Sequence, residues 1–230
     1  MAHAAANARS QIFGPTICEM SDPEQLAITF DDGPNPAITP KLLELLEKYN
    51  AKTTFFVIGR YVRECPELTR EIAARGHLLG NHTRTHPNLF LLSRQSVGDE
   101  LRHCQDAIQN ATGTGARYFR PPFGIRNPWV VSTARELGMQ TVMWSLIPGD
   151  WRDKPLEWLK NKMTPVATHA RDARHRKSGD VLCLHDGAHR EQNGDRTRTL
   201  AALEYWLPRW RDSGLKFATI AEAEIGRAHV

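Results

Sequence analysis

Strand-like and helix-like runs alternate along almost the whole sequence, and this alternation restricts the fold more than any other feature. Strand-like runs occur at residues 26–30, 52–59, 77–83, 116–124, 140–146, 179–187 and 216–224. Helix-like runs lie between them, at residues 38–50, 66–76, 93–113, 127–138, 155–176 and 197–214. The repeated β-then-α order predicts an α/β protein in which a parallel barrel or sheet is wrapped by helices.

The helix-like runs carry two further expectations. Pro165 predicts a break inside the run 155–176, because proline lacks a backbone donor and collides with the preceding turn. The tryptophans of these runs are interpreted as packing residues; they are Trp129, Trp158, Trp206 and Trp210.

Polar side chains collect where the strand-like runs end. These groups are Asp31-Asp32, residues 82–86, residues 120–124, Asp150-Trp151 and His185-Asp186. In a parallel α/β fold the carboxyl ends of the strands share one face, and the chemistry collects there. We therefore expect the five groups to meet in one site.

The composition excludes several classes of partner. The 30 basic and 26 acidic residues give a net charge of +4 with no long basic block, so nucleic acid is not expected, whereas an anionic surface is permitted. A hydrophobic fraction of 40% is enough for a sizeable core. No membrane span is expected, because no apolar stretch reaches about 18 residues. A monomer is the expected oligomeric state.

The first residues and the cysteines bear on location. Residues 1–25 are interpreted as an N-terminal extension and residues 26–225 as one catalytic domain. The small residues at the start fit a chain trimmed behind an export or anchor segment, which favours an extracytoplasmic location. Cys183 lies in an apolar run and is expected to be a buried thiol. One disulfide among Cys18, Cys65 and Cys104 remains open.

Asp31 and Asp32 pose an electrostatic question, because adjacent carboxylates at the closed end of an apolar strand repel each other and lose hydration. Gly33-Pro34 ends that strand. Cations, a metal or a shared proton would compensate the two charges. Alternatively, the pair forms an Asx-type turn in which one acid caps the next helix.

His82 and His86 are candidate metal ligands. Four positions separate them, so on a helical turn both imidazoles would project from one face. With Asp32 as a third ligand they would bind a divalent ion, which would also relieve the repulsion between Asp31 and Asp32. Three protein ligands leave positions open, as is typical of a catalytic site. The alternative is a pair of surface or capping histidines.

Five short motifs resemble, in order, those of polysaccharide deacetylases, the carbohydrate esterase group that includes chitin and peptidoglycan deacetylases. They are TFDDG at 29–33, HTRTH at 82–86, RPPFG at 120–124, DW at 150–151 and LHD at 184–186, and the resemblance covers about residues 26–223. It implies a distorted (β/α)7 TIM-like barrel and hydrolysis of an N-acyl group on an amino sugar of a chitooligosaccharide or peptidoglycan glycan. It also implies a divalent metal, usually zinc, with cobalt, nickel and manganese as alternatives.

The resemblance also implies roles for individual residues. Asp31 corresponds to the general base, and Asp32, His82 and His86 correspond to the metal ligands. Arg120 corresponds to the residue that holds the base, where it would keep Asp31 ionised by its opposite charge.

On the other side of the expected site, Asp150 corresponds to the acid that orients a catalytic histidine, and His185 to that histidine, which gives a proton to the departing amine. The backbone N–H of Phe123 corresponds to an oxyanion donor. Three further residues are expected on the substrate side: Pro122, Trp151 and Cys183.

The sequence departs from the family pattern at three positions. Phe123 stands where tyrosine is common, Ile147 stands where a second acid often precedes Asp150, and Cys183 stands where leucine usually lines the pocket for the acyl methyl group. The backbone role of Phe123 does not depend on the side chain. The smaller Cys183 is expected to change the shape of the acyl pocket.

Two other functions remain open. The same fold could act as a deformylase or deacetylase of a lipid-linked amino sugar, for which release of formate would be the signature. A carbohydrate-binding pseudoenzyme would keep the barrel without catalysis, but its signature would be loss of Asp31, a metal ligand or His185, and all are present.

Overall fold

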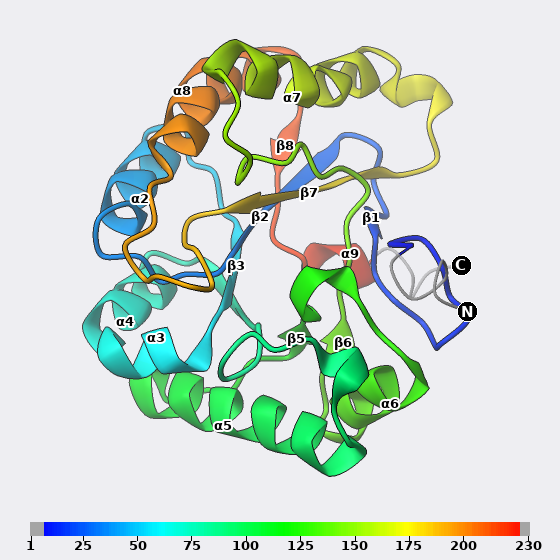
Figure 1. Ribbon diagram of the computed structural model, residues 1–230. Helices are drawn as coiled ribbons and strands as arrows, with labels where there is room; N and C mark the ends of the chain where they lie inside the picture. The colour runs from blue at the N-terminus through cyan, green and yellow to red at the C-terminus, as the bar shows by residue number, and fades with distance from the viewer. Residues whose placement is uncertain (1–6, 226–230) are drawn as a thin grey trace.

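A curled sheet with helices on its outer side forms the centre of the computed structural model, which describes residues 7–225 (Figure 1). The strands are β1 (Glu19–Met20), β2 (Gln25–Asp31), β3 (Thr54–Val57), β4 (Leu78–Asn81), β5 (Tyr118–Phe119), β6 (Gln140–Thr141), β7 (Gly179–His185) and β8 (Lys216–Phe217). Their order across the sheet is β1-β7-β2-β3-β4-β5-β6, and β8 pairs with β2.

The sheet is a distorted barrel. All neighbouring strands run parallel except the short β1, which is antiparallel to β7. Beyond these strands, two isolated bridges, Ile17–Val142 and Leu146–Leu182, continue the pairing from the β6 side toward β7. The predicted α/β class and barrel-like architecture are confirmed. The segment before Leu26, interpreted above as an extension, supplies β1 and one of these bridges.

The helices surround this sheet in Figure 1. They are α2 (Thr39–Lys48), α3 (Gly59–Glu64), α4 (Pro66–Ala74), α5 (Arg94–Thr112), α6 (Pro128–Glu136), α7 (Leu156–Arg171), α8 (Thr197–Asp212) and α9 (Glu222–Ile225), with 3-10 turns η1 (Leu89–Leu91), η2 (Pro122–Gly124) and η3 (Ala173–His175). Local chemistry sets their ends. The Ser93 side chain caps α5 by accepting from the Ser96 N–H, and Gly113 ends that helix in the left-handed region.

β2 is buried on both faces, and its side chains alternate between two clusters. Its outward residues, Leu26, Ile28 and Phe30, pack against the helices. Ala27 belongs to a second cluster on the concave side of the sheet. Because side chains alternate along a strand, Thr29 and Asp31 follow Ala27 toward that concave side. The apolar pattern of β2 therefore points Asp31 into the barrel.

β7 repeats this arrangement beside β2. Leu182 and Leu184 pack outward, and Val181 packs on the concave side. Cys183 and His185 follow Val181 inward by the same alternation. The parallel register then places His185 directly opposite Asp31.

Two expectations about the helix-like runs are wrong. α7 runs through Pro165 without a break, because its apolar face stays packed on both sides of the proline; Leu159, Met163 and Val166 are all buried there. Trp129 does not pack in a core, since 42% of its surface is exposed at the start of α6. Trp206 and Trp210 are buried and stacked, and Trp158 is partly buried against the same cluster.

Some strand-like runs form less sheet than expected. The run 116–124 leaves the sheet after β5 at Arg120, and the prolines at 121 and 122 have no backbone donor for a ladder. The run 140–146 keeps β6 and one bridge, and the run 216–224 forms β8 and then turns into α9.

The described residues bear on the disulfide left open above and on the expected absence of a membrane span. No disulfide links the four cysteines, so the disulfide left open among Cys18, Cys65 and Cys104 does not form, and Cys183 is buried as expected. No helix among residues 7–225 has the length and apolar character needed to cross a bilayer.

The stacked tryptophans give a test of the core. Trp210→Ala is expected to lower the free energy of unfolding by about 3–5 kcal/mol, because a fully buried indole leaves a cavity. Trp129→Ala, at an exposed position, is the control and should change stability by about 0.5 kcal/mol or less. Urea unfolding followed by circular dichroism measures both. Equal losses in the two variants would contradict this account of the core.

Candidate functional site

Asp31 and Asp32 point in different directions because the backbone turns between them. Asp31 completes β2, whereas Asp32 has a left-handed backbone with φ 72°. The turn continues through Gly33, where a Cβ atom would collide with the Asp186 carboxylate. Thr39 at the start of α2 donates a short hydrogen bond to that carboxylate, whose pKa burial raises to about 7. The two adjacent carboxylates therefore point toward different neighbouring side chains.

Asp32, His82 and His86 converge in a buried group that could hold a metal. The Nε2 atoms of His82 and His86 lie 3.5 and 3.3 Å from Asp32 Oδ1. The expected helical turn is wrong: residues 82–86 form an irregular loop in which Thr83 and His86 have φ of 68° and 63°. The His86 N–H donates to Thr83 Oγ1 at 2.9 Å and closes this loop.

The donor atoms of this group fit a divalent ion. His82 Nδ1 donates to the Arg120 carbonyl at 2.8 Å, so Nε2, which faces Asp32, is the ring nitrogen available to bind a metal. Asp32 Oδ1 is buried and has no hydrogen-bond partner among the described residues. Burial raises the pKa of Asp32, but the surrounding histidines, led by His189, outweigh it and leave the pKa below its usual range. An ionised, unsatisfied carboxylate facing two imidazoles is a nitrogen and oxygen donor set that suits zinc.

A second group, Asp31, Cys183 and His185, also comes close enough to hold a metal. Its sulfur is a poor ligand, because burial and the charge of Asp31 raise the pKa of the Cys183 thiol well above its usual value. The protonated Sγ instead contacts Asp31 Oδ2 at 3.5 Å. Metal binding requires a thiolate, so the group containing Asp32 is the better candidate.

His86 lies between two other rings. Phe123 contacts it edge-on with 4.6 Å between centroids, and His189 stacks on it at 4.5 Å. Its Nδ1 is buried and lacks a hydrogen-bond partner among the described residues. Burial and then the neighbouring His82 lower the pKa of His86 to about 3, so the ring is neutral. Packing, rather than a hydrogen bond to Nδ1, orients this imidazole.

Arg120 lies at the base of the cavity and fixes Asp31. Its Nη1 donates to Asp31 Oδ1 and to Thr29 Oγ1, both at 2.7 Å, and its Nη2 donates to the Met143 carbonyl at 2.9 Å. The guanidinium is fully buried and lies 4.1 Å from the centroid of the Phe56 ring. This pair holds Asp31 Oδ1, and Asp31 Oδ2 is the oxygen nearer to Cys183 and His82.

His185 lines the cavity and forms a hydrogen-bonded pair with Asp150 behind it. Its Nδ1 donates to Asp150 Oδ1 at 2.9 Å, and its backbone N–H and the Thr199 hydroxyl donate to Asp150 Oδ2. Burial lowers the pKa of His185, but the charge of Asp150 and its hydrogen bond outweigh this and raise the pKa to about 9. The pKa of Asp150 is lowered, because His185 and the other donors outweigh its own burial. The imidazole is thus a cation with its Nε2 side free of Asp150.

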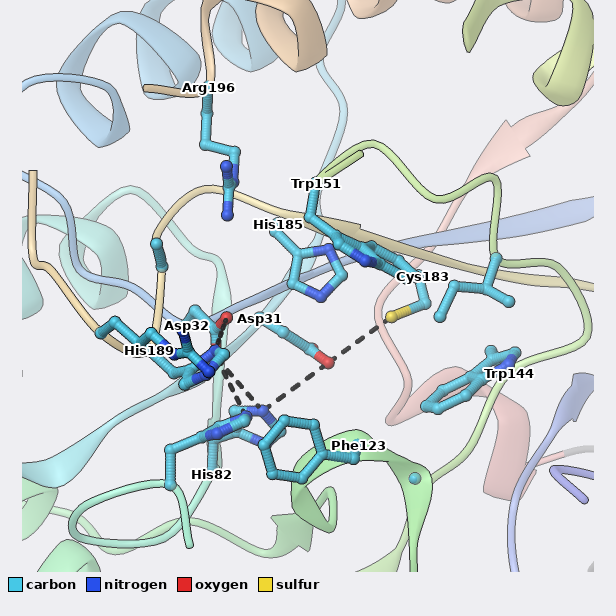
Figure 2. Close-up of a pocket in the computed structure, with 15 residues that line it drawn as sticks. Asp31, Asp32, His82, Phe123, Trp144, Trp151, Cys183, His185, His189 and Arg196 are labelled. Atoms are coloured by element: carbon cyan, nitrogen blue, oxygen red, sulfur yellow. Dashed lines mark hydrogen bonds and ion pairs between the residues drawn. The ribbon is translucent and has the colours of Figure 1, made fainter. Parts of the chain in front are cut away.

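These groups surround one cavity of about 460 Å³ (Figure 2). Eight of the eleven residues predicted for the site line it: Asp31, Asp32, His82, His86, Phe123, Trp151, Cys183 and His185. Arg120 and Asp150 lie behind their partners, and Pro122, the first residue of the η2 turn, is buried. Trp151 packs edge-on against His185 with 4.9 Å between centroids.

Four aromatic or basic lining residues escaped the sequence reasoning: Trp144, His189, Arg190 and Arg196. The last three come from the loop between β7 and α8, which has neither strand nor helix periodicity. The one available signal was its position, since it directly follows the strand end at His185. Trp144 follows β6, where the same rule applies.

Known proteins resemble this chain in sequence. Residues 19–142 match the family model described as polysaccharide deacetylase. A peptidoglycan-N-acetylglucosamine deacetylase from Bacillus cereus is 37% identical over 86% of this chain and 86% of its own length. A chitooligosaccharide deacetylase from Azorhizobium caulinodans is 35% identical over 79% of this chain and 85% of its own.

Solved structures show the same fold. A peptidoglycan N-acetylglucosamine deacetylase superposes with a TM-score of 0.79 at 26% identity, over 90% of this chain and 91% of its own. A family 4 carbohydrate esterase pseudoenzyme from Bacillus anthracis superposes with a TM-score of 0.78 at 26% identity, over 91% and 68%. Family model, relatives and fold agree with the resemblance of the five motifs, and the chain belongs to the polysaccharide deacetylase family.

Proposed function

We propose that this protein is a metal-dependent deacetylase that removes N-acetyl groups from amino sugars of a peptidoglycan or chitooligosaccharide glycan. One observation carries the proposal. The group that could hold a metal, which contains Asp32, and the protonated His185 lie in one cavity, on either side of Asp31. Two relatives support it, one named as a peptidoglycan-N-acetylglucosamine deacetylase and the other as a chitooligosaccharide deacetylase. Such glycans are consistent with an extracytoplasmic location.

Asp32, His82 and His86 would hold the metal. When bound, a divalent ion supplies a Lewis acid for the acyl oxygen and makes water more acidic. Zinc suits one carboxylate and two imidazoles, and cobalt, nickel or manganese accept the same donors.

Asp31 would act as the general base. Arg120 occupies Oδ1, so Oδ2 is the oxygen that would accept a proton from the attacking water. The Cys183 thiol, which contacts Oδ2, helps to orient this oxygen toward the cavity.

His185 would act as the general acid. An amine is a poor leaving group until it is protonated, and His185 can donate the proton from Nε2 because Asp150 occupies Nδ1. The backbone N–H of Phe123 would donate to the oxyanion that develops on the acyl carbon.

The remaining walls would hold the sugar and the acyl group. Trp144 and Cys183 line the cavity near Asp31, and the exposed rings of Phe123 and Trp151 offer flat faces at its mouth. The pseudoenzyme alternative is disfavoured, because Asp31, His185 and the metal-type group are all in place.

Acetate release tests the proposal directly. With zinc added, the protein is expected to release acetate from N-acetylated chitooligosaccharides, peptidoglycan fragments or both, and chelation should abolish release because the metal is lost. Chromatography of the released acids measures acetate and formate separately. Metal-bound protein that releases formate alone would favour the deformylase alternative, and protein that releases neither acid would defeat the proposal.

Two variants separate the base from the ligands. Asp31→Asn is expected to keep the metal and lower kcat by about 10²- to 10⁴-fold, because the proton acceptor is lost. His86→Ala should lose both metal and activity, whereas His175→Ala, a mostly exposed histidine, should change neither. Metal content per chain and kcat are the two readouts. A full metal complement in His86→Ala would remove His86 from the ligand set.

The pH profile tests the acid. His185 donates only while protonated, so activity is present below its pKa and is lost as the pH rises through that value, about 9 here. Asp150→Asn removes the charge that raises this pKa, and the alkaline limit of kcat should move to lower pH. Asp172→Asn, whose partner His175 is on the surface, is the control. An alkaline limit that does not move in Asp150→Asn would rule out this pair as the source of the acid.

A further inference from the structure

The loop between β7 and α8 is fixed over one side of the cavity. Tyr61 of α3 donates its hydroxyl to the Ala188 carbonyl at 3.0 Å, and Arg60 donates a short hydrogen bond to the His189 carbonyl. Further along, the buried Asn35 amide donates to the Gly194 carbonyl at 2.9 Å. These backbone anchors give the side chains of the loop defined positions.

Arg196, at the end of this loop, extends its guanidinium toward the cavity between His189 and His185 (Figure 2). Its Nη1 donates to the Asp195 carbonyl at 3.0 Å, while its Nε is buried and unpartnered. Within residues 7–225 it makes no ion pair, unlike Arg198 two positions later, which pairs with Asp153. A partly buried guanidinium with unused donors is costly unless an anion satisfies them.

The carboxylates that line the cavity already have partners. Only Asp31 and Asp32 supply carboxylates among its described lining residues. Arg120 neutralises Asp31 from below, and the histidines surround Asp32. No further carboxylate among the described lining residues is left for Arg190 and Arg196; the exposed Asp195, outside the lining, is the acid whose charge Arg196 attracts. A divalent ion would increase the positive excess. Walls of low dielectric constant strengthen the attraction of such a cavity for an anion.

We propose that Arg196, with Arg190, forms a subsite for an anionic group carried by the substrate next to its N-acylated sugar. The group is a carboxylate or a phosphate, because the planar guanidinium fork pairs with two oxygens of either. The inference rests on the proposed function and refines it: the favoured substrate is an acidic N-acetylated glycan, such as a peptidoglycan fragment with free lactyl carboxylates, rather than a neutral one.

The test compares substrates that differ in the anionic group next to the N-acetylated sugar. The probes are an N-acetylglucosamine–N-acetylmuramic acid disaccharide with a free lactyl carboxylate, its methyl ester, and the same disaccharide carrying a phosphate monoester. Acetate release gives kcat and KM, and calorimetry gives Kd for wild type and Arg196→Gln. The control is Arg174→Gln, which removes the same charge from an exposed position outside the cavity.

Wild type is expected to bind the free acid about tenfold more tightly than the ester, and Arg196→Gln should remove this difference by raising KM while kcat is unchanged. Tighter binding of the phosphate than of the carboxylate would identify phosphate as the natural group. Equal affinity of wild type for acid and ester, or equal losses on both in Arg196→Gln, would overturn the subsite. If no probe and no chitooligosaccharide releases acetate, the deacetylase proposal fails, while the charge difference in Kd still decides the subsite.

Discussion

Arg120 joins three parts of the barrel at the base of the cavity. It directly follows β5 in the sequence. Its guanidinium donates to two side chains of β2 and to backbone carbonyls that follow β6. A fully buried ion pair is costly to desolvate, and it persists only where its remaining donors are satisfied. The Phe56 ring and these carbonyls meet that condition around Arg120. Removing it would leave Asp31 as an uncompensated buried charge, so the position of the proposed base and the contacts between β2, β5 and the residues after β6 depend on the same side chain.

The alternation of strand-like and helix-like runs made much of the site predictable. It predicted a parallel sheet whose strands share one face at their carboxyl ends, and Asp31 and His185 meet at that face. The motif resemblance identified the partners Arg120 and Asp150, which lie far away in sequence. These features depend on periodicity and on motif order, and both are visible in one chain.

The rest depended on tertiary contacts that no local pattern encodes. His82 and His86 converge through left-handed residues in an irregular loop, although their spacing suggested a helix. Pro165 stays helical because the buried face of α7 outweighs one missing donor. His189 and Arg196 reach the cavity only because distant side chains, among them Tyr61 and Asn35, anchor the loop that carries them.

The rings around His86 have a consequence for how this site can vary. A metal-binding histidine is usually aligned by a hydrogen bond to its second nitrogen, whereas the proposed ligand His86 is aligned by contact with Phe123 and His189. Phe123 is also half exposed at the mouth of the cavity, where a sugar would lie. If the proposed function holds, one aromatic side chain contributes both to the sugar-binding surface and to the orientation of a metal ligand. A substitution at Phe123 that adapts the mouth to a new glycan would then also change metal affinity.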